Sequence, residues 1–145
     1  MPAQRVSRET LGAWILKCNP AVTNLPELIE HGVGSWCVQK TYRTTLFEPG
    51  QPCLLWVSGS ARAKPTPGLW ATGHLTGPAD WRPGEPTKYV VPLTLDFLPE
   101  PLPRTLLTAH PALADLEVIR QPQMSNPSFA TQPQYAALQE LLTTG

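Results

Sequence analysis

The chain has 145 residues, of which 41% are hydrophobic and 15% charged, so it is expected to fold as a single globular domain. Its 11 Lys and Arg balance its 11 Asp and Glu, and a formal net charge of zero argues against a large surface that follows a phosphate backbone. A small pocket that reads one nucleotide is compatible with that balance.

The cysteine content and the hydropathy of the sequence indicate the cellular compartment in which the protein is expected. Three cysteines without C-x-x-C spacing favour a reducing cytoplasm over secretion. No apolar run approaches the roughly 18–20 residues of a membrane helix, so no membrane partner is expected. The first ten residues are polar and lack the apolar core of a signal peptide. We therefore expect a cytoplasmic protein.

The N-terminal third alternates short apolar and polar segments. Residues 1–12 are predicted to be a flexible tail. The apolar run at 13–18, ended by Asn-Pro, predicts a buried strand. Residues 24–32 combine a capping Asn, an early Pro and a terminal Gly, which together indicate a short helix. A second short helix is expected at 41–47, before a Pro-Gly turn.

The middle of the chain is dominated by strand signals. The run 53–58 (CLLWVS) predicts a buried strand, and 68–76 is expected to pair with it as a hairpin. Residues 77–87 are rich in Pro and Gly, which predicts a long loop carrying Trp81. The alternation of apolar and polar side chains at 89–97 predicts a further strand.

Helical signals return towards the C-terminus. Short helical turns are predicted at 104–107 and 111–116, and a last short strand at 118–120. A polar loop at 121–127 leads to an amphipathic helix at 131–142. Strands joined by hairpins and flanked by short helices favour the α+β class, with mixed or antiparallel strands that curve towards a small barrel.

No catalytic or metal-binding pattern stands out. The histidines His31, His74 and His110 are scattered, and no pair of cysteines accompanies them at a metal spacing. The chain has neither a phosphate-binding Gly loop nor a G-x-S-x-G nucleophile elbow. We therefore expect a protein without catalytic activity, metal or cofactor.

Aromatic side chains beside flexible turns are more informative. Trp36 follows a Gly-Ser turn signal, and Trp81 lies in the predicted Pro/Gly loop. Each could pack as a lid over the core, but two such loops favour a shared ligand pocket. Polar residues at loop ends can read a base edge, although each is also an ordinary turn or cap residue; they are Asn19, Ser58, Ser125 and Asn126.

The order of these segments resembles an EVE domain, a branch of the PUA-like superfamily related to the YTH readers of methylated RNA. The resemblance rests on an ordered series and covers about residues 13–142. Its segments are W-I-L-K-C-N-P, S-W-C-V, P-G-Q-P-C-L-L-W-V-S-G, G-L-W-A-T-G-H-L-T-G-P and H-P-A-L-A-D-L-E-V-I-R-Q-P-Q-x-S-N. It implies a small PUA-like β-barrel over residues 13–145, with a C-terminal helix, that takes up an extruded modified base.

The resemblance also implies roles for single residues. Trp36 in S-W-C-V matches one tryptophan of the YTH aromatic cage, and Trp81 lies in a place similar to the second. Asn19 matches an asparagine that helps to read the base, and Ser125-Asn126 matches an S-N loop near the pocket.

Neighbours of these positions complete the predicted site. Ser35 would let the backbone approach a bound base closely, and Tyr42 and Arg43 begin the next turn. The sequence departs from many EVE domains at Lys17-Cys18-Asn19-Pro20, where they carry K-T-E-P, so the resemblance leaves the modification open.

The sequence therefore predicts a non-catalytic reader of a modified base in DNA or RNA, and a partner nuclease or modification enzyme is compatible with that role. Two alternatives remain. The same pocket could serve a small molecule or nucleotide, as a binding protein or an enzyme. The Pro-rich loops could instead make the chain a protein-interaction module.

Overall fold

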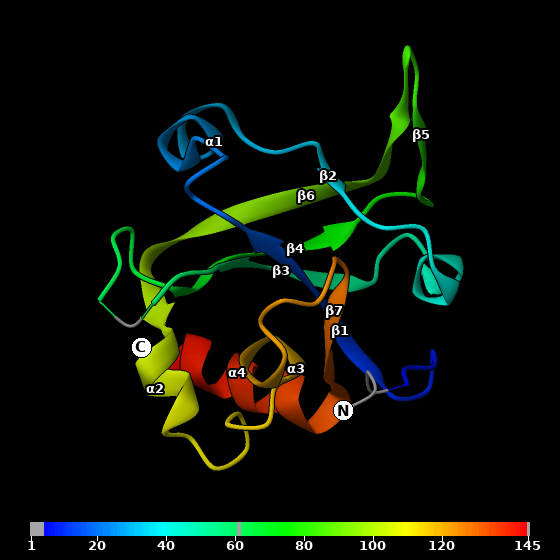
Figure 1. Ribbon diagram of the computed structural model, residues 1–145. Helices are drawn as coiled ribbons and strands as arrows, with labels where there is room; N and C mark the ends of the chain where they lie inside the picture. The colour runs from blue at the N-terminus through cyan, green and yellow to red at the C-terminus, as the bar shows by residue number, and fades with distance from the viewer. Residues whose placement is uncertain (1–4, 61, 145) are drawn as a thin grey trace.

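The computed structural model describes residues 5–60 and 62–144 (Figure 1). Its strands are β1 (Leu11–Cys18), β2 (Ser35–Cys37), β3 (Pro52–Val57), β4 (Gly68–Leu75), β5 (Asp80–Arg82), β6 (Glu85–Pro103) and β7 (Ser128–Thr131). Its helices are α1 (Leu25–His31), the 3-10 helix η1 (Tyr42–Leu46), α2 (Arg104–Thr108), α3 (Glu117–Arg120) and α4 (Gln132–Thr144).

The described strands form one mixed, seven-stranded sheet in the order β2-β6-β4-β3-β1-β7, with β5 paired to β6. The β1–β3 pair is parallel, and the remaining pairs are antiparallel. The predicted α+β class is thus confirmed. The barrel is approximate, because β2 and β7 stand at the two ends of this order and no ladder between them closes the sheet.

Both faces of the sheet are covered, which explains why β1 is almost continuously apolar. Ala13 and Ile15 point into a core cluster with leucines of α2, α4 and the segment before α3. Trp14 and Leu16 alternate to the other face, where they meet side chains of β4, β6 and β7. Figure 1 shows α2, α3 and α4 gathered on one side of the sheet and α1 on the other.

Local signals placed α1 correctly. The side chain of Asn24 accepts a hydrogen bond from the backbone N–H of Glu27 at 3.2 Å, so it caps the first turn. Gly32 follows the last turn with φ +83°, a conformation that favours glycine. The segment predicted as a helix at 41–47 forms η1, and Thr41 caps it by accepting from the N–H of Arg43.

Two predicted segments differ from the structure. Residues 77–87 are not a plain loop, because β5 and the start of β6 pair as a hairpin that includes Trp81. Residues 118–120, predicted as a strand, lie in α3. The last strand is β7 instead, which pairs with β1 through Trp14 and Phe129. Short apolar runs suit either structure, and the partner strand decides between them.

The N-terminal segment also differs from its prediction. Residues 1–4 lie outside the described residues. The tail predicted over 1–12 needs correction from residue 5 onward, because Val6 is only 3% exposed within the core and β1 already begins at Leu11. The backbone N–H of Val6 donates to the Tyr42 hydroxyl at 3.0 Å, which ties this segment to η1.

Of the described helices, none combines the length and the apolar character that crossing a bilayer requires.

Candidate functional site

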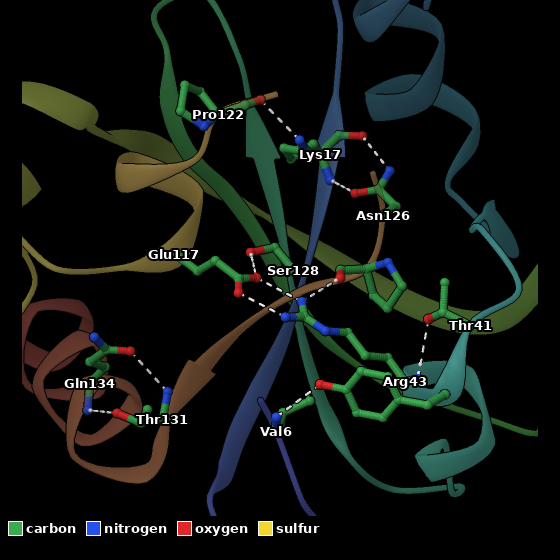
Figure 2. A network of polar contacts seen from close by, with 12 residues as sticks. Val6, Lys17, Thr41, Arg43, Glu117, Pro122, Asn126, Ser128, Thr131 and Gln134 are labelled. Carbon is green, nitrogen blue, oxygen red and sulfur yellow. Dashed lines mark hydrogen bonds and ion pairs between the residues drawn. The ribbon is translucent and has the colours of Figure 1, made fainter. Parts of the chain in front are cut away.

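Asn126 joins the two ends of the sheet. Its side-chain oxygen accepts from the backbone N–H of Lys17 at 2.7 Å, and its amide nitrogen donates to the carbonyl of Lys17 at 3.1 Å (Figure 2). Its own carbonyl accepts from the N–H of Gln39 at 2.9 Å, just beyond β2. The side chain therefore imitates a strand neighbour of β1, and the backbone links it to the β2 end.

Trp36 meets Asn126 at the same carbonyl. The indole N–H of Trp36 donates to the carbonyl oxygen of Lys17 at 3.2 Å, so two residues 90 positions apart share one acceptor. The ring is half-buried and packs against two of the hydrophobic core clusters. This bond fixes the orientation of the ring.

A cleft of about 310 Å³ opens beside this junction. Its volume is at the lower end of the roughly 300–1,000 Å³ of small-molecule sites and is ample for one nucleobase. We call it the seam cleft. It is lined by Gln39, Thr41, Tyr42, Arg43, Met124, Ser125, Asn126 and Pro127, and thus brings together four of the nine residues predicted from the sequence.

Asn126 lines the cleft and retains hydrogen-bonding capacity beyond its two bonds to Lys17. A side-chain amide has two N–H donors and two oxygen lone pairs, and the bonds to Lys17 use one of each. Ser125 beside it is exposed. The cleft therefore offers a donor and an acceptor on one wall, which is the pattern that a base edge needs.

Arg43 lines the cleft, but its guanidinium is fully engaged by buried partners within the protein. Its guanidinium forms a bidentate ion pair with Glu117 at 2.7 and 2.8 Å and donates to the carbonyl of Pro127 at 3.0 Å (Figure 2). Ser128 donates to the same carboxylate at 2.9 Å, and the guanidinium lies over the ring of Phe129. Burial is the largest single effect and lowers the pKa of Arg43, but the hydrogen bonds and charges of Glu117 and Tyr42 together outweigh it, so the pKa is raised.

This network is structural rather than ligand-binding. Arg43 and Glu117 are 3% and 1% exposed, so neither can reach a phosphate in solvent. Nearby, Lys17 directs its ammonium to the carbonyl of Pro122 at 2.9 Å. Desolvation lowers the pKa of that ammonium, and the charge of Glu117 acts in the opposite direction.

Asn19 and Ser58 lie in a second hollow. They directly follow the parallel strands β1 and β3, so both reach the same edge of the sheet. The recess there has a volume of about 470 Å³. The Asn19 side chain accepts from the N–H of Ala21 at 3.0 Å, and the Ser58 hydroxyl donates to the carbonyl of Cys18 at 3.2 Å. Asn19 thus stabilises a local turn, Ser58 ties the end of β3 to the end of β1, and neither lines the seam cleft.

Trp81 lies on the β5–β6 hairpin. It is 45% exposed, and its ring meets that of Tyr89 edge-on, with centroids 4.8 Å apart. Trp81 pairs with Tyr89 across the hairpin, and Trp36 pairs with Val91 across the opposite edge of β6. Tyr89 and Val91 are two residues apart, so both tryptophans are on the same face. The described ring pairs are Trp14–Phe47 and Trp81–Tyr89, so a cage formed by Trp36 and Trp81 stays a prediction.

Ser35 connects this hairpin to β2. Its hydroxyl accepts from a guanidinium nitrogen of Arg82 at 3.3 Å, so the start of β2 is tied to the end of β5. Ser35 itself faces away from Trp36, because neighbours on a strand alternate.

A hollow larger than the seam cleft contains none of the predicted residues. It is an apolar groove of about 770 Å³ between the segment that leads into α1 and the end of the β3–β4 loop. Trp70, Pro65 and Ile29 are among its lining residues, and Val22 at its rim is 81% exposed.

Sequence reasoning missed several participants. Lys17 acts at the junction through its backbone, which leaves no trace in the residue type. Glu117 was not singled out, because the buried partner of Arg43 is 74 residues away. Tyr89 could have been found from its place at the start of the alternating strand pattern, opposite a loop aromatic. Between residues 5 and 144, residue 61 aside, no three His, Cys, Asp or Glu side chains lie together as a metal site would require.

Comparison with known proteins identifies the fold. No family model and no curated protein matches the chain. Solved structures do match, at low identity. A hypothetical protein from Leishmania major has a TM-score of 0.72 at 14% identity, over 95% of this chain and 98% of that one. A Pseudomonas putida protein has a TM-score of 0.68 at 17% identity, over 90% and 99%.

Human THYN1, solved in complex with 5-methylcytosine-containing DNA, has a TM-score of 0.66 at 15% identity, over 90% of this chain and 96% of that one. The DUF55 domain of human thymocyte nuclear protein 1 is also similar, with a TM-score of 0.64. The chain has the fold of the DUF55 domain. The resemblance to EVE and PUA-like domains is thereby confirmed at the level of the fold.

Proposed function

We propose that the chain is a non-catalytic nucleic-acid reader that takes up a modified base in the seam cleft, beside Trp36. One observation carries the proposal. Asn126 lines a cleft with the volume of a ligand site and shares the carbonyl of Lys17 with the indole N–H of Trp36, whose ring is not among the residues that line the cleft. The shared fold with human THYN1, solved with 5-methylcytosine-containing DNA, supports DNA as the partner.

The physics of base uptake is compatible with this cleft. Extruding a base costs a few kcal/mol, and stacking on one aromatic ring contributes about 1–3 kcal/mol. A buried methyl group adds only about 0.8 kcal/mol, which is less than tenfold in affinity. Stronger discrimination requires a polar group that the wrong base leaves unpaired, and the free donor and acceptor of Asn126 are suited to that role.

Charge limits the contribution of the phosphate backbone. The zero net charge and the burial of Arg43 leave few cations near the cleft, so affinity for unmodified nucleic acid should be weak and only modestly dependent on salt. Such a domain recognises a base rather than a long stretch of backbone, which is the behaviour of a reader.

A steric block of the cleft tests the proposal. Ser125→Trp fills the cleft from an exposed position, and Ser60→Trp places the same side chain on an exposed loop at a distance. Binding is measured by fluorescence anisotropy with short DNA that carries one 5-methylcytosine. We expect Ser125→Trp to weaken binding by at least about tenfold, or 1.4 kcal/mol, and Ser60→Trp to leave it unchanged. Equal affinities for the two variants would refute the cleft as the site.

The alternative of a small-molecule binder or enzyme is separated by the ligand. Titration of tryptophan fluorescence with free 5-methyl-2′-deoxycytidine measures what the base contributes alone. Tight binding of the nucleoside, with no gain from an oligonucleotide, would favour that alternative over the reader.

Protein docking has one observation in its favour. The apolar groove beside α1 exposes Val22 and Ile29, side chains that usually avoid water. A partner captured equally well by wild type and by Ser125→Trp would show that docking uses a surface separate from the cleft.

A further inference from the structure

Three side chains form an outer ring cluster next to the seam cleft: Lys40, Trp81 and Tyr89. The two rings meet at an interplanar angle of 63°. The ammonium of Lys40 lies 5.9 Å from the centroid of the Trp81 ring and 5.8 Å from that of Tyr89. Both distances are within the range of a cation–π contact, so one cation holds two rings from different strands.

The outer ring cluster adjoins the cleft through the chain itself. Gln39 lines the cleft, and Lys40 is the next residue. The N–H of Val38 donates to the carbonyl of Tyr89 at 2.9 Å, which continues the pairing of β2 with β6 up to this point. Trp36, Tyr89 and Trp81 therefore follow one another on one face, from the half-buried junction to the exposed hairpin.

Packing alone does not account for Trp81. A tryptophan that serves only the core is expected to be buried, yet this one is 45% exposed on a ribbon that projects beyond the rest of the sheet (Figure 1). Tyr89 meets the ring edge-on and Lys40 lies near it, while nearly half of the residue remains exposed to solvent. An exposed ring that is held in place by a second ring and a cation is suited to stacking.

The charges around the outer ring cluster are mixed, and among the described residues Lys40 is the cation in contact with the rings. Arg82 lies 3.8 Å from Glu85 and donates to Ser35, so it is turned to the other side of the hairpin. Asp80 accepts from the N–H of Trp81 through its side chain. In the described part of the chain, Lys40 forms no ion pair with a carboxylate. Its ammonium thus remains available for an anion.

We infer that the outer ring cluster is a stacking platform for the nucleotide that flanks the base in the seam cleft. The flanking base stacks on Trp81, and its phosphate pairs with Lys40. The inference rests on the proposed function and assigns Trp81 to the neighbour of the read base rather than to the base itself. It predicts that the protein prefers an oligonucleotide over the free nucleoside, because only the oligonucleotide reaches both places.

The experiment compares two probes. The first is a short single-stranded DNA with one central 5-methylcytosine, and the second is free 5-methyl-2′-deoxycytidine. Trp81→Ala should weaken oligonucleotide binding by about 5- to 150-fold, the range for loss of one stacked base, and leave nucleoside binding unchanged. Trp81→Phe should recover part of the loss. Leu106→Ala, which truncates a side chain of similar exposure on α2, should have no effect on either probe.

Lys40→Gln tests the phosphate contact independently. It should lower the slope of log affinity against log salt by about 0.7 for a single strand and leave nucleoside binding unchanged. Lys40→Arg should restore the slope.

The outcomes separate the two proposals. If Trp81→Ala weakens both probes equally, Trp81 belongs to the base pocket and the platform is refuted. If it weakens neither while wild type binds, the platform is refuted and the reader stands. If wild type itself does not bind the modified oligonucleotide, the proposed function fails and the platform fails with it.

Discussion

Arg43 and Lys40 are both cations, three residues apart, and the fold gives them opposite tasks. Arg43 is buried against Glu117, where its charge holds η1, α3 and the start of β7 together. Lys40 lies over the exposed rings of Trp81 and Tyr89. A buried charge needs all its partners at once, whereas an exposed one can exchange partners for a ligand. We call the buried group of Arg43, Glu117 and Ser128 the inner network. It differs from the outer ring cluster in burial, and variants of each can test what that difference means.

The largest effect is expected at the inner network. Glu117→Ala leaves the Arg43 guanidinium buried without its carboxylate, which should cost about 3–5 kcal/mol in the free energy of unfolding, measured with urea. The matched control is Glu48→Ala, because Glu48 pairs with Arg8 at 3.3 Å on the surface. That exposed pair should contribute less than about 1 kcal/mol. Similar losses for both variants would contradict a special role of the inner network.

Asn126→Asp tests the junction between the two regions. The aspartate keeps an acceptor for the N–H of Lys17 but loses the donor to its carbonyl and adds a charge. We expect a loss of about 1–3 kcal/mol, and a change in the tryptophan emission, because Trp36 shares that carbonyl. Ser125→Asp places the same charge next door on an exposed residue and should leave the emission unchanged. An unchanged emission in Asn126→Asp would separate Asn126 from the positioning of Trp36.

The contrast between buried and exposed groups also applies to the thiols of Cys53, which is buried, and Cys37, which is exposed. Burial raises the pKa of Cys53 to about 12, from an ordinary value of 9.0. Between pH 9 and 12 the unfolded chain loses this proton while the folded chain keeps it, so the free energy of unfolding should fall as pH rises, by up to about 1.4 kcal/mol per pH unit. Urea unfolding of wild type and Cys53→Ala measures the slope, which should be flatter in the variant.

Cys37 supplies the control for that slope. It is exposed on β2, so Cys37→Ala removes a thiol without touching the core and controls for the loss of a cysteine as such. A slope that is equally steep in wild type, Cys53→Ala and Cys37→Ala would assign the effect to other groups.

The smallest effect on stability is expected at the outer ring cluster. Because Trp81 is half-exposed on a projecting hairpin, Trp81→Ala should change the free energy of unfolding by no more than about 0.5 kcal/mol. Trp14→Ala, at a tryptophan that is 0% exposed, is the matched comparison and should cost about 3–5 kcal/mol. A large loss in Trp81→Ala would place the ring in the core and contradict its role as a platform.

Patterns that are local in the chain could be predicted from the sequence. The strand at β1, the hairpin of β3 and β4, and α1 with Asn24 and Gly32 all follow from hydropathy, turn residues and caps. The ordered segments also predicted the α+β fold. These features depend only on neighbours within a few residues, so a short stretch of the sequence contains the whole signal for each.

Tertiary structure decided everything that depends on a distant partner. Only the sheet brings Asn126 to Lys17, 109 residues away, and only the packing of η1 against α3 buries Arg43 on Glu117. The same holds for Asn19 and Ser58, which the parallel β1–β3 pair places in a recess apart from the seam cleft. Residue type states what a side chain can bond, but burial and partner choice are set when strands far apart in the chain come together.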